Sequence, residues 1–229
     1  MASLNKLLSS LSKSDFELLE PHLEPVTLSM RKMLEKPNSR ITAAYFPECG
    51  FASVVAQQPN GKEAEVGLIG REGMTGMPIV LGDHRTPHAT YVQAAGDGQC
   101  VRASDLRVAI RSSRSLHDSL LKFVQAFGVQ TSHTAISNAR SKLDQRLARW
   151  LLMAHDRLEN DSLPLTDEFL SLMLAVRRAG VTEAVHALEV QGLISRTRGH
   201  IAVRNRKGLE RVAAESYGVP EAEYRRLMN

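Results

Sequence analysis

The sequence predicts an α+β fold, in which an N-terminal antiparallel β-sandwich or barrel precedes a long helix and a C-terminal helix–turn–helix with a hairpin. Three observations support this prediction. Short β-prone runs separated by turn residues occupy residues 25–105. A helical spacing of apolar residues begins after Cys100. Finally, the last pair of predicted helices is followed directly by an arginine-rich hairpin, residues 193–205.

The N-terminal elements follow from caps and turns. Residues 3–20 are expected to form a short helix, in which Ser14 serves as a helix cap. The stretch 51–69 predicts a hairpin that turns at Asn60-Gly61. A further short helix is expected over 104–111, with Ser104 as its cap.

The long helix is expected over residues 115–139. Four large apolar residues follow a 4-3-4 spacing, and small or polar residues continue the same stripe. This pattern predicts a helix–helix interface, although packing within the same domain fits it as well. The four residues are Leu116, Leu120, Phe123 and Phe127. A second helix, residues 142–160, is expected to end before Leu163-Pro164.

The C-terminal pattern is a helix, a tight turn, a second helix and a hairpin. Thr166 is expected to cap the first helix, Ala175-Val176 form the turn, and residues 178–190 form the second helix. Two short strands with a turn at Gly199 complete the hairpin. Two helices braced in this way leave the second free to enter the major groove of DNA.

The positive charge is concentrated near the C-terminus. The net charge is +4, and the first 139 residues are close to neutral. Residues 177–211 carry eight Lys and Arg against three Glu. A local basic cluster favours a polyanionic partner for this part of the chain.

Several classes of protein are disfavoured. No run is apolar enough to span a membrane and no secretion signal is present, so we expect a cytoplasmic protein without a membrane partner. Cys49 and Cys100 are too few for an iron–sulfur cluster or a four-thiolate metal site. Because no catalytic or nucleotide-binding motif is found, we expect neither an enzyme nor a metal site.

The stretch 165–194, LTDEFLSLMLAVRRAGVTEAVHALEVQGLI, resembles the winged helix-turn-helix of the Crp/Fnr family of bacterial transcription regulators. Residues 20–103 resemble that family's β-roll of the cyclic-nucleotide-binding type. The resemblance implies a jelly-roll-like sensor domain over 1–139, with a dimerisation helix at about 115–139, and a DNA-binding domain over 140–229. It also implies a homodimer on a two-fold operator of double-stranded DNA, with RNA polymerase as a further partner.

The resemblance weakens in the phosphate cassette, residues 70–94. His88 and Ala89 fall where family members that bind cyclic AMP carry an Arg-Ser pair, and Met74 falls where they carry a glutamate. A mostly neutral histidine does not supply the fixed cationic donors that a phosphate needs, which argues against cyclic AMP. No cofactor is expected and the effector is unknown. The candidate ligand-binding residues are Glu72, Met74, Thr75, Arg85 and His88.

The resemblance also suggests DNA-binding roles. Arg178 matches a base-contacting arginine, and its planar fork suits guanine. Glu183 stands where many relatives carry a second arginine, so the operator should differ from the commonest half-site. Gly180 should make the start of this helix less rigid. The full set of candidate DNA-binding residues is Arg177, Arg178, Thr182, Glu183, His186, Arg196, Arg198 and Arg204.

Two functions remain open at this point. The first is a sequence-specific DNA-binding transcription regulator of the Crp/Fnr type. The alternative is a degenerate dimeric module that binds a ligand or a protein but not DNA.

Overall fold

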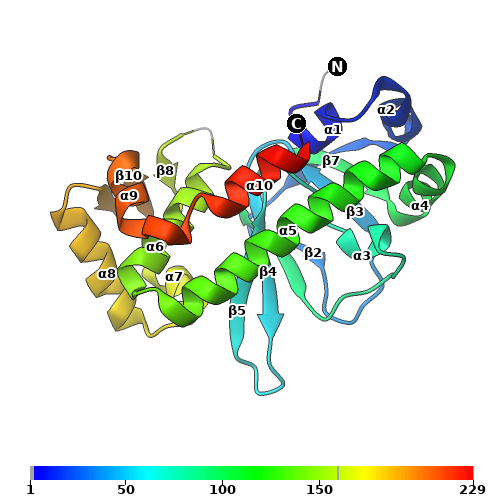
Figure 1. Ribbon diagram of the computed structural model, residues 1–229. Coiled ribbons are helices and arrows are strands. Elements are labelled where there is room, and N and C mark those ends of the chain that lie inside the picture. Colours follow the sequence, from blue (N-terminus) through cyan, green and yellow to red (C-terminus); the bar gives the residue numbers. More distant parts are fainter. Residues whose placement is uncertain (1–2, 159, 229) are drawn as a thin grey trace.

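The computed structural model describes residues 3–158 and 160–228. Its N-terminal part is a β-roll flanked by short helices (Figure 1). Its elements are α1 (Lys6–Ser9), α2 (Lys13–Leu19), η1 (Glu20–His22), β1 (Glu24–Leu28), β2 (Met33–Glu35), β3 (Ala43–Pro47), β4 (Phe51–Gln57), β5 (Glu63–Ile69), α3 (Met77–Val80), β6 (Ala89–Ala94), β7 (Gly96–Arg102) and α4 (Ala103–Ser112).

Two antiparallel sheets form the roll. One has the strand order β1-β7-β3 and the other has the order β2-β6-β4-β5. Strands β4 and β5 form the predicted hairpin, and Gly61 in its turn has a φ of 80°, which a residue with a side chain rarely adopts. The predicted antiparallel roll is therefore confirmed.

The C-terminal part is mostly helical and carries one small sheet of order β8-β10-β9. The long helix α5 was predicted to within a residue at each end. The elements are α5 (Arg114–Arg140), α6 (Leu143–His155), β8 (Ser162–Leu163), α7 (Asp167–Met173), α8 (Arg178–Val190), β9 (Ile194–Thr197), β10 (His200–Val203), α9 (Arg206–Ala213), η2 (Ala214–Ser216) and α10 (Val219–Met228).

Three predicted helix ends or caps are wrong. The single helix over 3–20 is two helices, and Ser12 rather than Ser14 caps the second by accepting a hydrogen bond from Asp15 N. Ser104 lies inside α4, which begins one residue earlier and has no side-chain cap. Helix α6 ends at His155 and not at the predicted residue 160, and Leu163 lies in strand β8.

The apolar stripe of α5 faces the chain's own β-roll, which corrects the expected helix–helix seam. The stripe packs with the core residues of the roll, and Phe123 lies so close to Gly73 that a Cβ there would be 2.1 Å from its ring. All four side chains are at most 8% exposed: Leu116, Leu120, Phe123 and Phe127. The spacing identified the apolar face correctly, but the partner is a sheet of the same chain.

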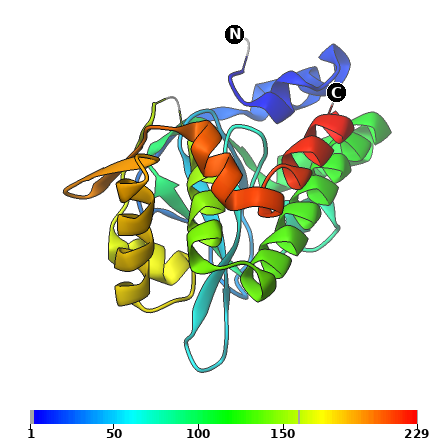
Figure 2. The ribbon, with the colours of Figure 1, turned by 60° about the vertical axis from the view of Figure 1, so that its left-hand side comes forward.

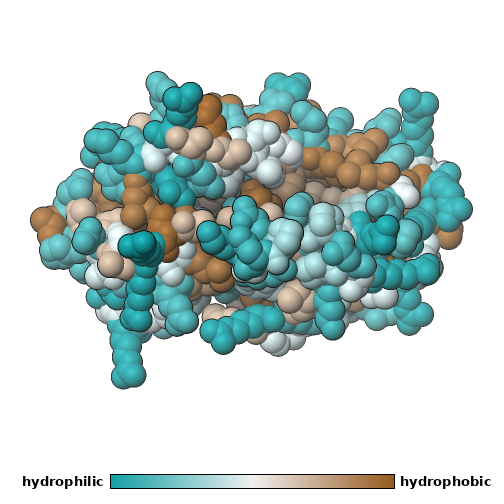
Figure 3. Space-filling model, turned by 90° about the horizontal axis from the view of Figure 1, so that it is seen from below, coloured by the Kyte–Doolittle hydropathy of each residue, from teal (hydrophilic) through white to brown (hydrophobic). Residues whose placement is uncertain are grey.

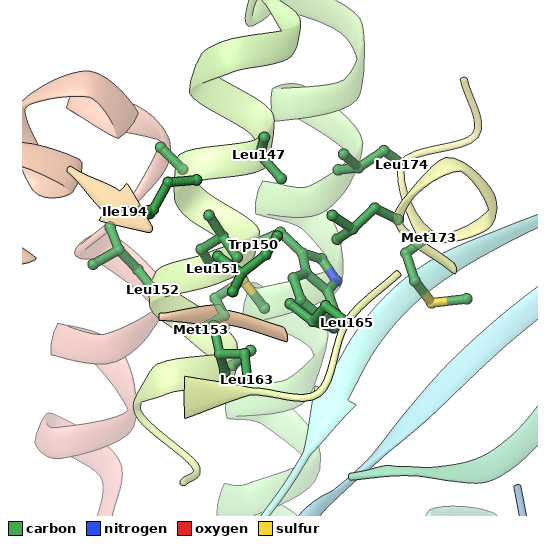
Figure 4. Packing of buried hydrophobic residues seen from close by; sticks show 14 of the residues in the cluster. Leu147, Trp150, Leu151, Leu152, Met153, Leu163, Leu165, Met173, Leu174 and Ile194 are labelled. Atoms are coloured by element: carbon green, nitrogen blue, oxygen red, sulfur yellow. The ribbon is translucent and has the colours of Figure 1, made fainter. Parts of the chain in front are cut away.

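Helix α6 packs in a hydrophobic core to which both parts of the chain contribute side chains. Figure 4 shows its side chains between the small C-terminal elements and the strands of the roll. Trp150 packs edge-on against Phe51 of β4, at 6.3 Å between ring centroids, and against Phe169 of α7, at 5.8 Å. Hydrophobic packing therefore continues across the predicted domain boundary at residue 139.

A buried carboxylate crosses the same contact. Glu65 of β5 accepts hydrogen bonds from Trp150 Nε1 and Ser53 Oγ, both at 2.6 Å. Burial raises the pKa of Glu65 to about 7, because the two hydrogen bonds and the distant charges of Arg157 and Arg149 only partly offset the lost hydration. Glu65 is therefore largely protonated in the folded protein below neutral pH.

The surface is mixed in character. From below, hydrophilic side chains surround separate hydrophobic patches (Figure 3). No helix in the described part of the chain combines the length and apolarity needed to cross a membrane.

Glu65 predicts that the protein loses stability as the pH rises through the slightly acidic range. The unfolded chain releases the Glu65 proton near pH 4.5, whereas the folded chain holds it to about pH 7. Because the folded state binds more protons between these values, this group's contribution falls by about 3 kcal/mol as the pH rises from 4.5 to 7. Urea denaturation across that range should show a fall in wild type that is smaller by about this amount in Glu65→Gln; the fall that remains comes from other buried acids such as Glu35, whose pKa is also raised.

The matched control is Glu63→Gln, two residues earlier on the same strand. It should retain the wild-type pH dependence. A Glu65→Gln variant with the full wild-type dependence would contradict the assignment.

Candidate nucleic-acid interface

Helices α7 and α8 form a helix–turn–helix whose start and turn are fixed by local chemistry. Thr166 Oγ1 accepts a hydrogen bond from Phe169 N at 3.2 Å and so caps α7, as predicted. The turn runs through Ala175, whose φ of 51° reverses the chain, and Val176 N donates to Ser171 O. Helix α8 then begins at Arg178.

One face of α8 is packed and the other is exposed. Val181, Val185 and Leu188 are fully buried in the core shared with α6. Gly180 has a packing role: a Cβ there would be 3.2 Å from Leu143 Cδ2, so its small size permits the close approach of α8 to α6. Figure 2 shows α8 at the edge of the molecule, with its outer side uncovered.

A single buried carboxylate connects α7, α8 and the hairpin. Asp167, the first residue of α7, is 6% exposed. Its Oδ2 accepts from Thr182 Oγ1 of α8 at 2.7 Å, and its Oδ1 pairs with Arg196 of β9 at 3.0 Å. We call these three residues the Asp167 brace. Because each partner comes from a different element, the brace fixes their relative orientation.

The hairpin β9–β10 stands beside α8 as a wing. Its turn contains Gly199 with a φ of 76°, as predicted, and Arg198 precedes that glycine at the exposed tip. The wing is tied to α8 because Arg196 N donates to Glu189 Oε1 at 2.8 Å. Arg204, at the end of the wing, donates to Ser195 Oγ.

The predicted DNA-binding residues divide into two groups. All eight residues are exposed to solvent, but the side chains of Thr182 and Arg196 bond to Asp167 in the Asp167 brace. Within the described residues, no carboxylate lies within 4.0 Å of the cationic groups of Arg177, Arg178, Arg198 or Arg204. These four, together with Glu183 and His186 on the outer face of α8, form the available surface.

Arg206 is one of the eight basic residues of 177–211, but the structure excludes it from that surface. It pairs with Asp156 at 2.7 Å and with Glu210 at 3.1 Å. Burial acts to lower the pKa of Arg206, but Asp156, Tyr217 and Glu210 together outweigh it, so the pKa lies above its usual value. Its charge is therefore used inside the chain.

The five candidate ligand residues lie in different environments. Met74 and Thr75 are fully buried, and Thr75 Oγ1 accepts a hydrogen bond from Tyr45 N. Glu72 pairs with Arg157 at 2.7 Å, whereas Arg85 lies exposed in the loop before β6 and His88 is partly buried. Among the described residues, no group of three His, Cys, Asp or Glu side chains could hold a metal ion.

Residues 145–212 match the family of Crp-like helix-turn-helix domains. This match identifies a Crp-like helix-turn-helix domain in the C-terminal part of the chain. Comparison with curated protein sequences finds no match.

Solved structures share the fold of the whole chain. A putative Crp/Fnr regulator from Eubacterium rectale has a TM-score of 0.70 at 16% identity, covering 90% of this chain and 97% of that one. FixK2 from Bradyrhizobium japonicum has a TM-score of 0.72 at 15% identity, covering 84% and 98%. The c-di-GMP-responsive regulator CLP from Xanthomonas campestris has a TM-score of 0.65 at 14% identity, covering 84% and 99%.

Asp167 is the residue of this surface that the sequence did not single out. In the sequence it is an acidic residue in the first turn of a helix, where its negative charge interacts favourably with the helix dipole. Its partners are 15 and 29 positions away in the chain, so no local spacing indicates the brace.

We predict that Asp167→Asn weakens DNA binding more than it changes the fold. Asparagine keeps the shape but loses the charge that holds Arg196, so α8 and the wing are less firmly oriented. Binding to duplex DNA, measured by fluorescence polarisation, should weaken at least tenfold, with a loss of about 1–3 kcal/mol in the free energy of unfolding.

The neighbouring acid provides the control. Glu168 is exposed, so Glu168→Gln makes the same change of charge beside the brace. Because the loss of a negative charge by itself favours binding to DNA, Glu168→Gln should bind as tightly as wild type or slightly more tightly. Equal weakening by both variants would contradict the role of the brace.

Proposed function

We propose that the chain is a DNA-binding regulator of the Crp/Fnr type that acts as a homodimer, reads a two-fold operator through α8 and the wing, works in the cytoplasm and does not use cyclic AMP as its effector. The observation that carries the proposal is the exposed face of α8, which begins with Arg177 and Arg178 and is flanked by Arg198 at the wing tip; none of these arginines has a carboxylate partner among the described residues. In such a module the recognition helix enters the major groove and flanking cations contact phosphates.

The outer face of α8 suggests which groups read bases. Arg178 is exposed in the first turn, and its fork can donate to both acceptors of guanine. Glu183 and His186 share the exposed side, and a carboxylate there accepts only from cytosine N4. Arg177 precedes the helix, where it suits a phosphate.

The wing and the brace have different roles in this proposal. Arg198 and Arg204 have no carboxylate partner among the described residues, so they suit phosphate contacts. Thr182 and Arg196, first considered as direct contacts, instead position the helix and the wing through Asp167.

Arg178→Ala should relax specificity at one base pair. The loss of a bidentate contact to guanine is expected to cost about 1–3 kcal/mol on the preferred operator and little on an operator changed at that position. An operator selected from random DNA and its single-base variants should be compared by polarisation. An unchanged ratio between them would show that Arg178 does not read that base.

Arg198→Gln is the matched control, because it should weaken binding to all sequences alike and reduce the salt dependence by about one unit of slope. The alternative function, a module that binds a ligand or a protein but not DNA, predicts no salt-dependent binding to duplex DNA by any variant.

The hydrogen bonds of Glu35 to residues of the cassette support a sensor that does not use cyclic AMP. Glu35 accepts hydrogen bonds from Gly76 N at 2.7 Å and from Thr90 Oγ1, close to His88. Burial raises the pKa of Glu35, since its hydrogen bonds do not fully replace water. An internal acid at this place, with no fixed arginine beside it, is the opposite of what a phosphate requires.

The dimer surface is proposed on the outer side of α5. Exposed small residues recur there at helical spacing, and Ile136 is 57% exposed. Gly128 has open space where its Cβ would be, so the chain's own packing does not require a glycine in the middle of this helix. A second copy of α5 would make use of both features. The residues of this face are Gly128, Ser132, Ala135 and Ile136.

Ile136→Glu should therefore shift the protein towards monomers, measured by sedimentation equilibrium, because two glutamates would meet in an apolar seam. Val108→Glu is the control, since Val108 is equally exposed, at 59%, but lies on α4. A dimer that tolerates Ile136→Glu would refute this choice of surface.

A further inference from the structure

A cavity of about 560 Å³ lies where the two parts of the chain meet. Its walls are the loop after β5, helix α5, the end of α6 and helix α10. Figures 1 and 2 both show α10 lying along α5 and ending near α1. Phe123, Phe127 and Pro220 supply apolar wall, and Tyr217 and Tyr224 supply aromatic rings.

One polar group in this cavity has no partner. Arg71 Nε is buried, and no hydrogen-bond acceptor within the described residues reaches it. Buried N–H groups normally have partners, because the loss of water is otherwise not compensated. The carboxylate nearest in sequence, Glu72, is directed to Arg157 at 2.7 Å.

Among the described residues that line the cavity, cationic side chains without an ion pair outnumber carboxylates without one. Two of its arginines are neutralised within the chain: Arg157 by Glu72 and Arg206 by Asp156. Lys6, Arg71 and Arg225 line the same cavity from α1, the β5 loop and α10, and no carboxylate in the described residues lies within 4.0 Å of their cationic groups. Three cations from separate elements therefore face a single acid without an ion pair, Glu221.

We propose that this cavity binds a small organic anion, a carboxylate or phosphate on a ring-sized apolar body, with Arg71 as its central donor. The anion provides the acceptor that Arg71 Nε lacks, and Lys6 and Arg225 complete a cationic entrance. The apolar body packs on the phenylalanines of α5. The binding itself does not depend on the proposed function; only its effect on DNA binding does.

The cavity is placed so that occupancy affects both parts of the chain. Tyr224 of α10 donates to Glu72 O at 2.8 Å, and Arg157 after α6 bonds the carboxylate of the same residue. A ligand held by Arg71 would therefore stabilise the contact of α6 and α10 with the roll.

The test uses the full-length protein and three probes: phenyl phosphate, benzoate and inorganic phosphate, each against sodium chloride at equal ionic strength. Thermal melting should show a saturable rise with phenyl phosphate or benzoate and a smaller one with inorganic phosphate. Arg71→Met should lose the rise, with an apparent affinity at least tenfold weaker. Without probe it should melt no lower than wild type, because Arg71 Nε makes no bond that the variant loses.

Arg198→Gln on the wing is the matched control and should keep the full rise. A rise that disappears in Arg198→Gln but persists in Arg71→Met would place the anion on the DNA-binding surface and overturn the proposal. So would the absence of a saturable rise with all three probes. DNA binding by the same samples, measured by polarisation, tests the proposed function separately.

Discussion

The packing of Trp150 is the interaction on which the arrangement of the whole chain depends. Its indole lies between Phe51 of the roll and Phe169 of α7, and its N–H is bonded to Glu65. An aromatic ring of this size buries a large apolar area, and edge-on ring pairs add to that stabilisation. The winged module is therefore held directly against a sheet of the β-roll and not only through the α5–α6 connection.

The same contact brings ionisable groups into a region of low dielectric. Arg149 is 5% exposed, and burial lowers its pKa although Glu221 and Glu65 act in the opposite sense. Burial acts likewise on Arg157, but there Glu72, Asp156 and Glu221 together outweigh it and the pKa is raised. Buried ion pairs contribute little net stability compared with apolar packing, yet removing one member is costly. The contact is thus more specific in geometry than an apolar seam of equal area would be.

Much of the fold could be predicted because it depends on local signals. The limits of α8, the Thr166 cap and the turns at Gly61 and Gly199 follow from the caps, periods and turn residues of neighbouring positions. The partner of a surface is not local information. The apolar spacing that includes Phe123 predicted the apolar face of α5 correctly, but only the tertiary structure shows that the roll covers this face. For the same reason the sequence does not distinguish Arg196, which pairs with Asp167, from Arg198, which has no carboxylate partner among the described residues.

Helix α6 is the physical link between the proposed anion cavity and the recognition helix. At one end, Arg157 follows its last turn and reaches Glu72 beside the cavity. At the other end, Arg146 donates to Leu174 O in the turn that precedes α8. A helix of 13 residues is about 20 Å long, so α6 spans the distance between Arg157 and the turn before α8. The Asp167 brace keeps α8 and the wing in a fixed mutual orientation. In the proposed homodimer, an effector that shifted α6 would therefore alter the spacing of the two copies of α8 and not the shape of each helix.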